Sequence, residues 1–197
     1  MRAAWFAAVC VPAVLAASAI AHVTAGGAGA GPTVVAVGDG PATIATGFSV
    51  ADGRVVTVAH VLEGAAITVR GADGVARRGS VVRRDDELDL ALLDVPGLPA
   101  APARLGAGTR LLVRRDGRIA ALPARVVRRI DARVRTAGSG RVAHRPALEL
   151  AVRAAAGDSG APVVVGSRVA GVVFARSDGR AGVAYAVDAA VLERLGE

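Results

Sequence analysis

The sequence predicts an all-β fold, and three features of the chain carry that prediction. Short runs rich in β-branched residues recur along it, each bounded by Gly, Asp or Pro. No long run repeats apolar residues at the spacing of an amphipathic helix, apart from one short stretch near the C-terminus. Turns separate the runs at fairly even intervals. Many short strands with even turns are typical of β-barrels.

The expected strands form two groups on either side of a proline-rich break at 97–103. Because domain boundaries favour such segments, we take the break as the crossing between a first barrel, about 33–96, and a second, about 104–187. The strands expected in the first group are 33–37, 43–50, 54–58, 67–70, 76–83 and 88–95. Those expected in the second are 110–114, 118–130, 133–136, 141–152, 162–165, 168–175 and 182–187. Asp188 is expected to cap a short C-terminal helix through Leu195.

Residues 1–25 predict export. Arg2 precedes an uncharged stretch rich in Ala and Val, and small-residue cleavage sites end near Ala21. The stretch is also just long enough to span a bilayer, so a cleaved signal peptide and a membrane anchor both stay open. The signal peptide is favoured because Ala contributes little to membrane insertion. Either way, 26–32 is expected to be a flexible linker and 33–197 an exported domain, secreted or in the cell envelope, with a possible membrane tether through 1–25.

Composition narrows the classes of function. All 24 basic residues are Arg and the formal net charge is +7, but only 3% of residues are aromatic. Scattered Arg residues with few aromatic side chains to stack on bases disfavour a nucleic-acid partner. Cys10 is the only cysteine and lies in the targeting segment, so the exported domain is expected to lack disulfides and to tolerate reductants. The three histidines are widely separated, so neither a metal nor another cofactor is expected.

One stretch, 156–164 (Ala-Gly-Asp-Ser-Gly-Ala-Pro-Val-Val), has the residue types of a nucleophile loop. Ser159 can attack a carbonyl only if a base removes its proton. Gly157 has no side chain, so its N–H can lie beside that of Ser159, and two such donors form an oxyanion hole. Taken alone, the stretch could be an ordinary turn, because Gly, Asp and Ser favour turns.

Two segments upstream provide candidates for the base and its partner. His60 follows a strand-like run, Val-Val-Thr-Val-Ala, and its near-neutral titration suits a general base. Asp89 lies in an apolar run, where a buried carboxylate needs a partner. It is preferred over Asp85, Asp86 and Asp94, which remain alternatives.

These three segments, 47–62, 86–93 and 156–164, resemble the catalytic segments of the chymotrypsin- or trypsin-like serine proteases. The order His60, Asp89, Ser159 is that of the family, and the separations of 29 and 70 residues are more similar to bacterial HtrA-type and MarP-type protease domains than to digestive enzymes. The resemblance implies two six-stranded Greek-key barrels with a catalytic triad in the cleft between them. It also implies hydrolysis of peptide bonds in proteins or peptides. We expect a protease domain without a PDZ domain.

The resemblance also raises a question about Asp158. In activated trypsins the matching aspartate pairs with a freed N-terminal amine, but no activation site of that type precedes the first barrel here. Asp158 is therefore expected to pair with an internal Arg, with Arg141, Arg145 and Arg153 as candidates, and no trypsin-type zymogen switch is expected.

The specificity site is expected beside the nucleophile. The segment 168–176 resembles the strand that pairs with substrate, although Phe174 stands where digestive relatives carry a serine that supports the triad aspartate. The expected substrate-binding residues are Arg153, Phe174, Ala175, Arg176 and Gly182. The only acid in the approach to the nucleophile is Glu149, at its far end, so we expect small or medium apolar side chains before the cut bond, with acidic ones second. The alternatives are an inactive protease-fold module that binds peptides or cell-envelope partners, and an esterase.

Overall fold

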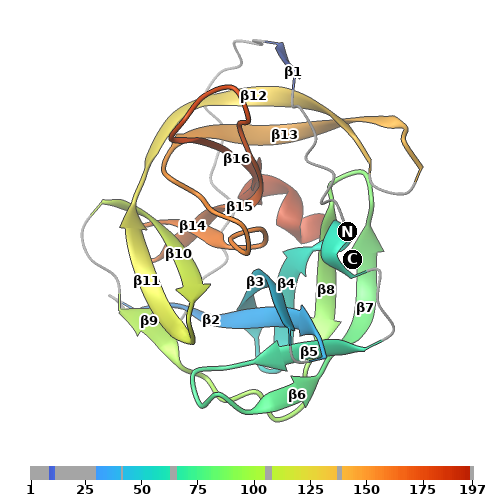
Figure 1. Ribbon diagram of the computed structural model, residues 1–197, viewed down its shortest axis with the longest axis vertical. Helices are drawn as coiled ribbons and strands as arrows, with labels where there is room; N and C mark the ends of the chain where they lie inside the picture. Colours follow the sequence, from blue (N-terminus) through green and yellow to red (C-terminus); the bar gives the residue numbers. More distant parts are fainter. Residues whose placement is uncertain are drawn as a thin grey trace.

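The computed structural model describes residues 9–11, 30–40, 42–62, 66–104, 108–136 and 139–195. Nearly all the regular structure in these residues is β, arranged in two antiparallel sheets (Figure 1). The all-β prediction is confirmed. No helix of the described residues is long and apolar enough to cross a membrane.

The first sheet, blue to green in Figure 1, comes from the N-terminal half of the chain. Its order is β6-β5-β2-β3-β4-β8-β7, with β9 beside β2. Gly79 alone separates β6 from β7, so one bent segment pairs with β5 at one end and with β8 at the other and closes the sheet. The strands are β2 (Ala30–Asp39), β3 (Ala42–Ala51), β4 (Arg54–Val58), β5 (Ile67–Arg70), β6 (Ala76–Arg78), β7 (Ser80–Asp85), β8 (Leu90–Asp94) and β9 (Pro102–Arg104).

The second sheet, yellow to red apart from the dark blue β1, repeats this plan with the order β1-β12-β13-β16-β15-β14-β10-β11. Ala124 alone separates β11 from β12, so this sheet is also closed by one bent segment. The strands are β1 (Val9–Val11), β10 (Thr109–Arg115), β11 (Arg118–Pro123), β12 (Arg125–Arg135), β13 (Val142–Ala151), β14 (Pro162–Val165), β15 (Arg168–Arg176) and β16 (Val183–Asp188).

The predicted double barrel of six strands each is recovered when each bent segment counts as one strand. With each bent segment counted as two strands, and with the edge strand β9 or β1 added, each sheet has eight strands.

Two boundaries differ from the prediction, and the C-terminal helix agrees with it. Residues 30–32 of the expected linker belong to β2, because Ala30 pairs with Arg104 of β9, which itself lies at the end of the expected break. The second barrel has one continuous strand β12 where a break at 131–132 was expected, because β13 pairs with its whole length. The C-terminal helix is confirmed as a 3-10 helix, η2 (Ala189–Leu195), and the Asp188 carboxylate accepts a hydrogen bond from the Ala190 N–H at 3.1 Å.

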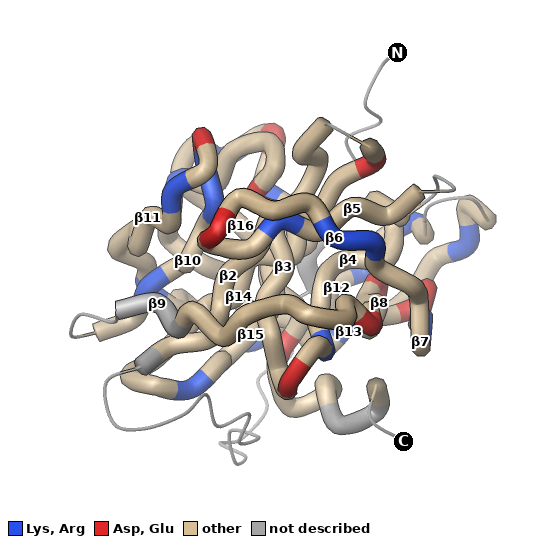
Figure 2. Tube along the Cα trace, turned by 90° about the horizontal axis from the view of Figure 1, so that it is seen from below, with Lys and Arg blue, Asp and Glu red and all other residues tan. Residues whose placement is uncertain are grey.

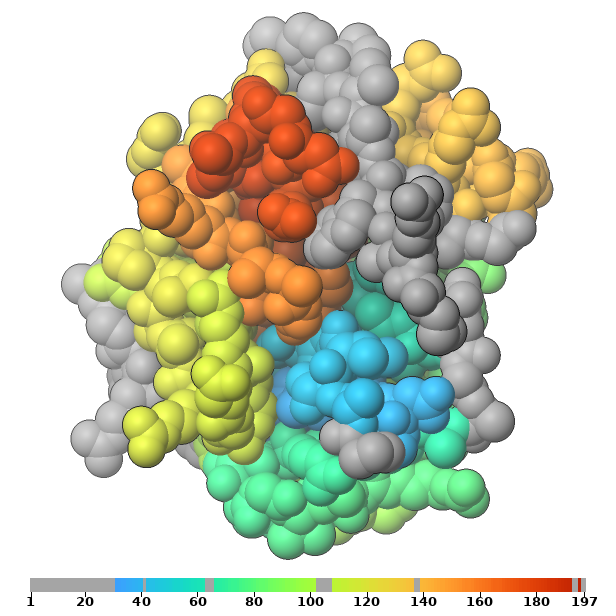
Figure 3. Space-filling view, viewed as in Figure 1, coloured from blue at the N-terminus to red at the C-terminus, as the bar shows by residue number. Residues whose placement is uncertain are grey.

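The two barrels share a hydrophobic core. One cluster contains Phe48 and Leu90 from the first barrel and Leu112 and Phe174 from the second. Figure 3 shows the orange part of the second barrel directly against the blue part of the first. Charged residues are spread over both barrels and both signs are interspersed (Figure 2). Shared apolar packing therefore holds the barrels together along the seam between them.

Candidate active site

His60 and Asp89 are joined by two hydrogen bonds. His60 lies in η1 (Ala59–Val61), directly after β4. Its ring Nδ1 is 2.8 Å from Asp89 Oδ2, and its backbone N–H donates to Asp89 Oδ1 at 2.9 Å. Because a carboxylate only accepts hydrogen bonds, Nδ1 carries the proton in this contact and Nε2 is left as an acceptor. The ring is partly exposed, whereas Asp89 is only 7% exposed.

Asp89 lies in the turn before β8, and not inside a strand as predicted. Its φ is +60°, a left-handed conformation that costs a non-glycine residue roughly 1–2 kcal/mol. Two contacts define the turn: the Leu88 N–H donates to Asp85 Oδ1 at 2.9 Å, and the Ala59 N–H donates to the Asp89 carbonyl at 3.0 Å. The strained residue is thus the one whose carboxylate meets the histidine.

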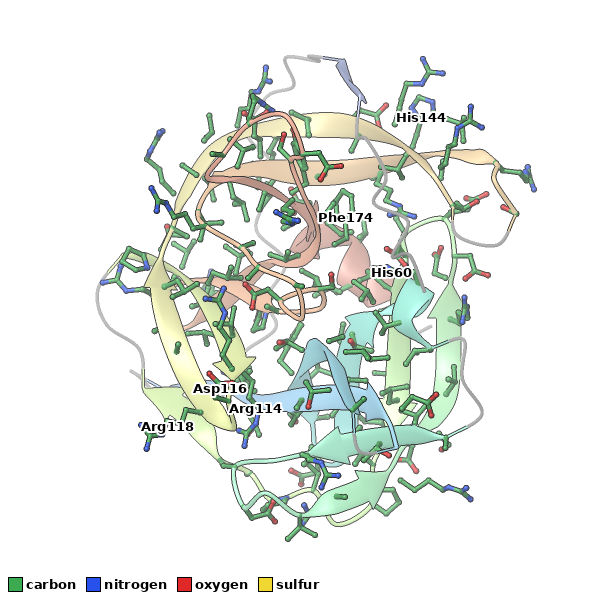
Figure 4. All side chains as sticks on the ribbon, viewed as in Figure 1. His60, Arg114, Asp116, Arg118, His144 and Phe174 are labelled. Atoms are coloured by element: carbon green, nitrogen blue, oxygen red, sulfur yellow. The ribbon has the colours of Figure 1, made fainter. Side chains whose placement is uncertain are left out.

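The three alternatives to Asp89 have other partners. Asp85 accepts the turn hydrogen bond from Leu88, Asp86 accepts from Arg84 at 2.6 Å, and Asp94 pairs with Arg54 at 3.5 Å. None of these contacts involves His60. His144 pairs with Asp131 at 2.8 Å and lies at the outer side of β13, away from His60 (Figure 4).

A buried arginine that the sequence did not link to this site also reaches Asp89. Arg145 of β13 is 4% exposed, and its Nη1 lies 3.4 Å from Asp89 Oδ2. Burial lowers the pKa of Arg145, although the nearby Asp89 and Asp85 carboxylates act in the opposite direction. The sequence carried no signal for this contact, because Arg145 comes from the other barrel.

Ser159 and Gly157 lie in a tight loop between β13 and β14. The loop is closed by hydrogen bonds from Asp158 N–H to the Ala155 carbonyl at 3.2 Å and from Gly160 N–H to the Val173 carbonyl at 2.7 Å. Gly157 has a φ of +90°, which favours glycine. Among the described residues, no acceptor takes the N–H of Gly157 or of Ser159. Both donors are therefore available to an oxygen atom of a ligand.

The first barrel supports this loop directly. Thr46 N–H donates to the Ser159 carbonyl at 2.8 Å, and Thr46 Oγ1 donates to the Gly157 carbonyl at 2.9 Å. A Cβ atom on Gly160 would lie 2.0 Å from the Thr46 carbonyl oxygen and 2.6 Å from Thr57 Oγ1. Gly160 is therefore required for the close approach of the two barrels at the serine. Within the described residues, no hydrogen bond joins the Ser159 hydroxyl to the His60 ring.

Asp158 pairs with an internal arginine, but with none of the three candidates near it in the sequence. Its partner is Arg115, at the end of β10, which donates through Nε at 3.1 Å and through Nη2. The Asp158 carboxylate also accepts from the Ala155 N–H at 2.8 Å. The antiparallel pairing of β10 with β14 brings Arg115 beside the loop, because Leu111 lies opposite Val163. This long-range pairing left no local signal in the sequence.

The five residues expected to bind substrate differ in their burial and in their contacts. Ala175 and Arg176 lie at the end of β15, and the Gly182 carbonyl accepts from Val152 N–H at 2.9 Å. Phe174 is buried with its ring centroid 5.3 Å from Arg145 Cζ, so it supports Arg145 and offers little open wall. Arg153 is exposed.

The one acid in the segment that leads to the nucleophile, Glu149, is neutralised. Glu149 of β13 is 4% exposed and lies opposite Tyr185 of β16. Arg180 donates to both of its carboxylate oxygens, at 3.1 and 3.2 Å, and Arg128 donates at 2.9 Å. Arg180 also contacts the Tyr185 hydroxyl at 2.6 Å. Glu149 is therefore not a free carboxylate that could attract a basic side chain.

The fold and this seam define a double-barrel protease architecture, and comparison with known proteins identifies the family. Residues 45–172 match the family model of the trypsin-like peptidase domain, so the chain belongs to that family. It is a serine endopeptidase of the trypsin-like class. The comparison with curated proteins gives no match.

Solved structures of bacterial proteases are similar to the chain. The active form of the Rv3671c protease from M. tuberculosis is 27% identical, with a TM-score of 0.73 over 93% of each chain. The inactive form of that protease is 29% identical, with a TM-score of 0.69 over 83% of this chain and 87% of that one. The HtrA-type protease AlgW with a decapeptide is 18% identical, with a TM-score of 0.64 over 85% of this chain and 64% of that one, and this likeness supports the fold alone.

Proposed function

We propose that the protein is an exported endopeptidase whose catalytic triad is His60, Asp89 and Ser159. The observation that carries the proposal is the double contact between His60 and Asp89, at 2.8 Å through the ring and 2.9 Å through the backbone. It fixes the tautomer and the orientation of the ring together, which is the task of the aspartate in a triad. Ser159 lies in a glycine-containing loop that Thr46 of the first barrel supports.

The mechanism follows from these contacts. His60 Nε2 removes the Ser159 proton as Oγ attacks the substrate carbonyl, and the imidazolium is stabilised by Asp89. His60 then gives that proton to the leaving amine, and the C–N bond breaks. A water molecule, deprotonated by His60, hydrolyses the acyl-enzyme and releases Ser159 with its proton restored.

The N–H groups of Gly157 and Ser159 are proposed as the oxyanion hole. Neither has an acceptor among the described residues, so both can donate to the oxygen that becomes negative in the transition state. One such donor contributes about 2.7–4 kcal/mol to transition-state stabilisation. The Arg115–Asp158 pair holds the residue between the two donors without a new N-terminal amine. This arrangement supports an enzyme that needs no trypsin-type activation cleavage.

We further propose that the residue before the cut bond is small or medium and apolar. The paired state of Glu149 supports this, because this carboxylate is compensated by Arg180 and Arg128 and is not free to attract a basic side chain. Arg180, in place of Arg153, is the arginine proposed to act on specificity, since it contacts the Tyr185 hydroxyl and both carboxylate oxygens of Glu149. Matched peptides that differ only at that position, with Ala, Val, Leu, Glu, Arg and Lys, test this. Fastest cleavage after Arg or Lys would contradict it.

Export is proposed from the sequence of residues 1–25. Its support is the uncharged, Ala-rich stretch with small-residue cleavage sites after a single Arg. Fractionation of cells that express the full chain, with N-terminal sequencing of the product, tests export and cleavage together.

Labelling by a fluorophosphonate probe tests the triad. The wild-type protein is expected to label at Ser159 and to cleave a peptide library, and the Ser159→Ala variant is expected to do neither while it keeps its melting temperature. Ser80→Ala is the matched control, because Ser80 is an exposed serine on β7. Absence of labelling in the wild-type protein would favour an inactive peptide-binding module. Labelling without peptide cleavage would favour an esterase.

A further inference from the structure

We propose that Arg145 is a positioning residue that holds Asp89 in place for His60 from the opposite barrel. This inference rests on the proposed triad. Among the described residues, Arg145 is the one side chain besides His60 that donates a hydrogen bond to Asp89. Both side chains meet the same oxygen, Oδ2, at 2.8 Å from His60 and 3.4 Å from Arg145.

The guanidinium also binds the turn that carries the aspartate. Nε donates to the Glu87 carbonyl at 2.5 Å, and Nη2 donates to the Asp86 carbonyl at 3.4 Å. One planar group thus contacts two backbone carbonyls and the side chain of a single turn. The fixed geometry of the guanidinium donors makes the relative position of these acceptors specific.

This turn needs external support because Asp89 has a φ of +60°. Left-handed conformations of non-glycine residues persist only where the surroundings determine them strongly. Arg145 contacts the two backbone carbonyls that precede the strained residue and also the carboxylate of that residue. Its loss would let the turn relax and would move the carboxylate relative to His60.

The position of Arg145 itself is fixed by burial and stacking. The residue is 4% exposed, and its Cζ lies 5.3 Å from the centroid of the Phe174 ring. Phe174 also lies 6.4 Å from the Tyr185 ring, between centroids. An arginine stays charged at this degree of burial and is costly there without partners. Its partners are the turn and the carboxylates of Asp89 and Asp85.

A purely structural role would predict a loss of stability alone, and a positioning role predicts a loss of kcat. In Arg145→Met, which keeps an apolar side chain of similar length, kcat is expected to fall by about 10²-fold, as for a misplacement of about 1 Å. KM is expected to stay unchanged, because the hydrogen bonds of Arg145 go to the turn that carries Asp89 and its ring contact is to the buried side chain of Phe174. Arg145→Lys keeps the charge but cannot reach all three acceptors, so its kcat should lie between those of Arg145→Met and the wild type.

A spectroscopic readout follows the contact directly. The proton between His60 Nδ1 and Asp89 gives a low-field proton resonance, which should be present in the wild type and shifted or lost in Arg145→Met. Arg129→Met is the matched control, because Arg129 also pairs with a carboxylate, Asp188 at 2.9 Å, but makes that contact within the second barrel. In this control the kcat and the resonance should both be unchanged.

The outcomes separate this inference from the proposed function. If the wild type does not label with the fluorophosphonate, the triad is wrong. If the wild type labels, but a folded Arg145→Met keeps the wild-type kcat and resonance, the triad stands and the role of Arg145 is overturned. If Arg145→Met does not fold, Arg145→Lys decides in the same way, and a wild-type kcat in that variant overturns the role.

Discussion

Two aspartates at the seam are each paired with an arginine of the second barrel, and the pairs differ in their exposure to water. On the histidine side, Asp89 is 7% exposed and Arg145 is 4% exposed. On the serine side, Asp158 is 1% exposed, but the side chain of Arg115 is 38% exposed. The two arginines come from different strands, β13 and β10.

The difference in exposure decides whether burial or the carboxylate partner has the larger effect on the pKa of each arginine. Burial lowers the pKa of Arg145 more than the nearby carboxylates raise it. The hydrogen bond to Asp158 raises the pKa of Arg115, and outweighs the smaller effect of burial. The Arg145 pair is therefore a desolvated contact beside the proposed catalytic histidine, whereas the Arg115 pair tethers a loop from its solvent side. Disruption of the first should affect chemistry most, and disruption of the second should affect the shape of the loop.

The largest effect is expected from the aspartate on the histidine side. In Asp89→Asn the amide can donate to Nδ1 and stabilise the wrong tautomer, so kcat should fall by about 10⁴-fold with the fold intact. Steady-state kinetics on a peptide substrate measure this. Asp94→Asn is the control, because Asp94 forms only a half-exposed pair with Arg54. A fall in kcat of less than tenfold in Asp89→Asn would contradict the expectation that the Asp89 pair affects the chemistry more than the Asp158 pair does.

A smaller effect is expected on the serine side. Asp158→Asn should lower kcat by about 10²-fold, similar to the loss of one oxyanion donor, because the Gly157 N–H loses its fixed direction. Arg115→Met should lower it less, since Ala155 N–H still binds the Asp158 carboxylate. The rate of fluorophosphonate labelling measures both. The same loss in both variants would show that the arginine, and not the loop contact, controls the donors.

Glu149 extends the comparison to a carboxylate with two arginines. Burial raises its pKa, but hydrogen bonds from Arg180 and Arg128 outweigh this and lower it below 4.5. A lowered pKa in the folded state gives stability that is present above about pH 4.5 and is lost as the pH falls through the lowered pKa. Thermal melts between pH 7 and pH 2 should therefore show a steeper acid loss in the wild type than in Glu149→Gln. An identical acid slope in both would show that the two arginines do not favour the charged form.

The smallest effect is expected for a pair at the surface. Arg54 and Asp94 are 3.5 Å apart, with side chains 40% and 41% exposed. Arg54→Met should change the free energy of unfolding by no more than about 1 kcal/mol, because exposed pairs are screened by water. Urea denaturation measures this, and it gives the baseline for the buried pairs. A larger loss would mean that exposure is a poor guide to the strength of these pairs.

The sequence by itself determined the features that depend on neighbouring residues. The β-branched runs and their turn residues predicted an all-β barrel fold, because strand formation and turn geometry are largely local, and the family resemblance implied that there are two barrels. The segments around His60, Asp89 and Ser159 carried the family resemblance for the same reason. Their pattern predicted a contact between His60 and Asp89, and the structure gives its distances.

Only the tertiary structure decided which charged side chains face each other. Arg115 reaches Asp158 over 43 residues of sequence, and Arg145 reaches Asp89 over 56. The contact of Arg115 depends on the register of β10 against β14 within the second barrel, and that of Arg145 on the packing of one barrel against the other. Neither quantity is encoded in nearby residues. The same reason explains why Arg153, adjacent to the nucleophile loop in the sequence, is exposed, while Glu149 is enclosed by Arg128 and Arg180.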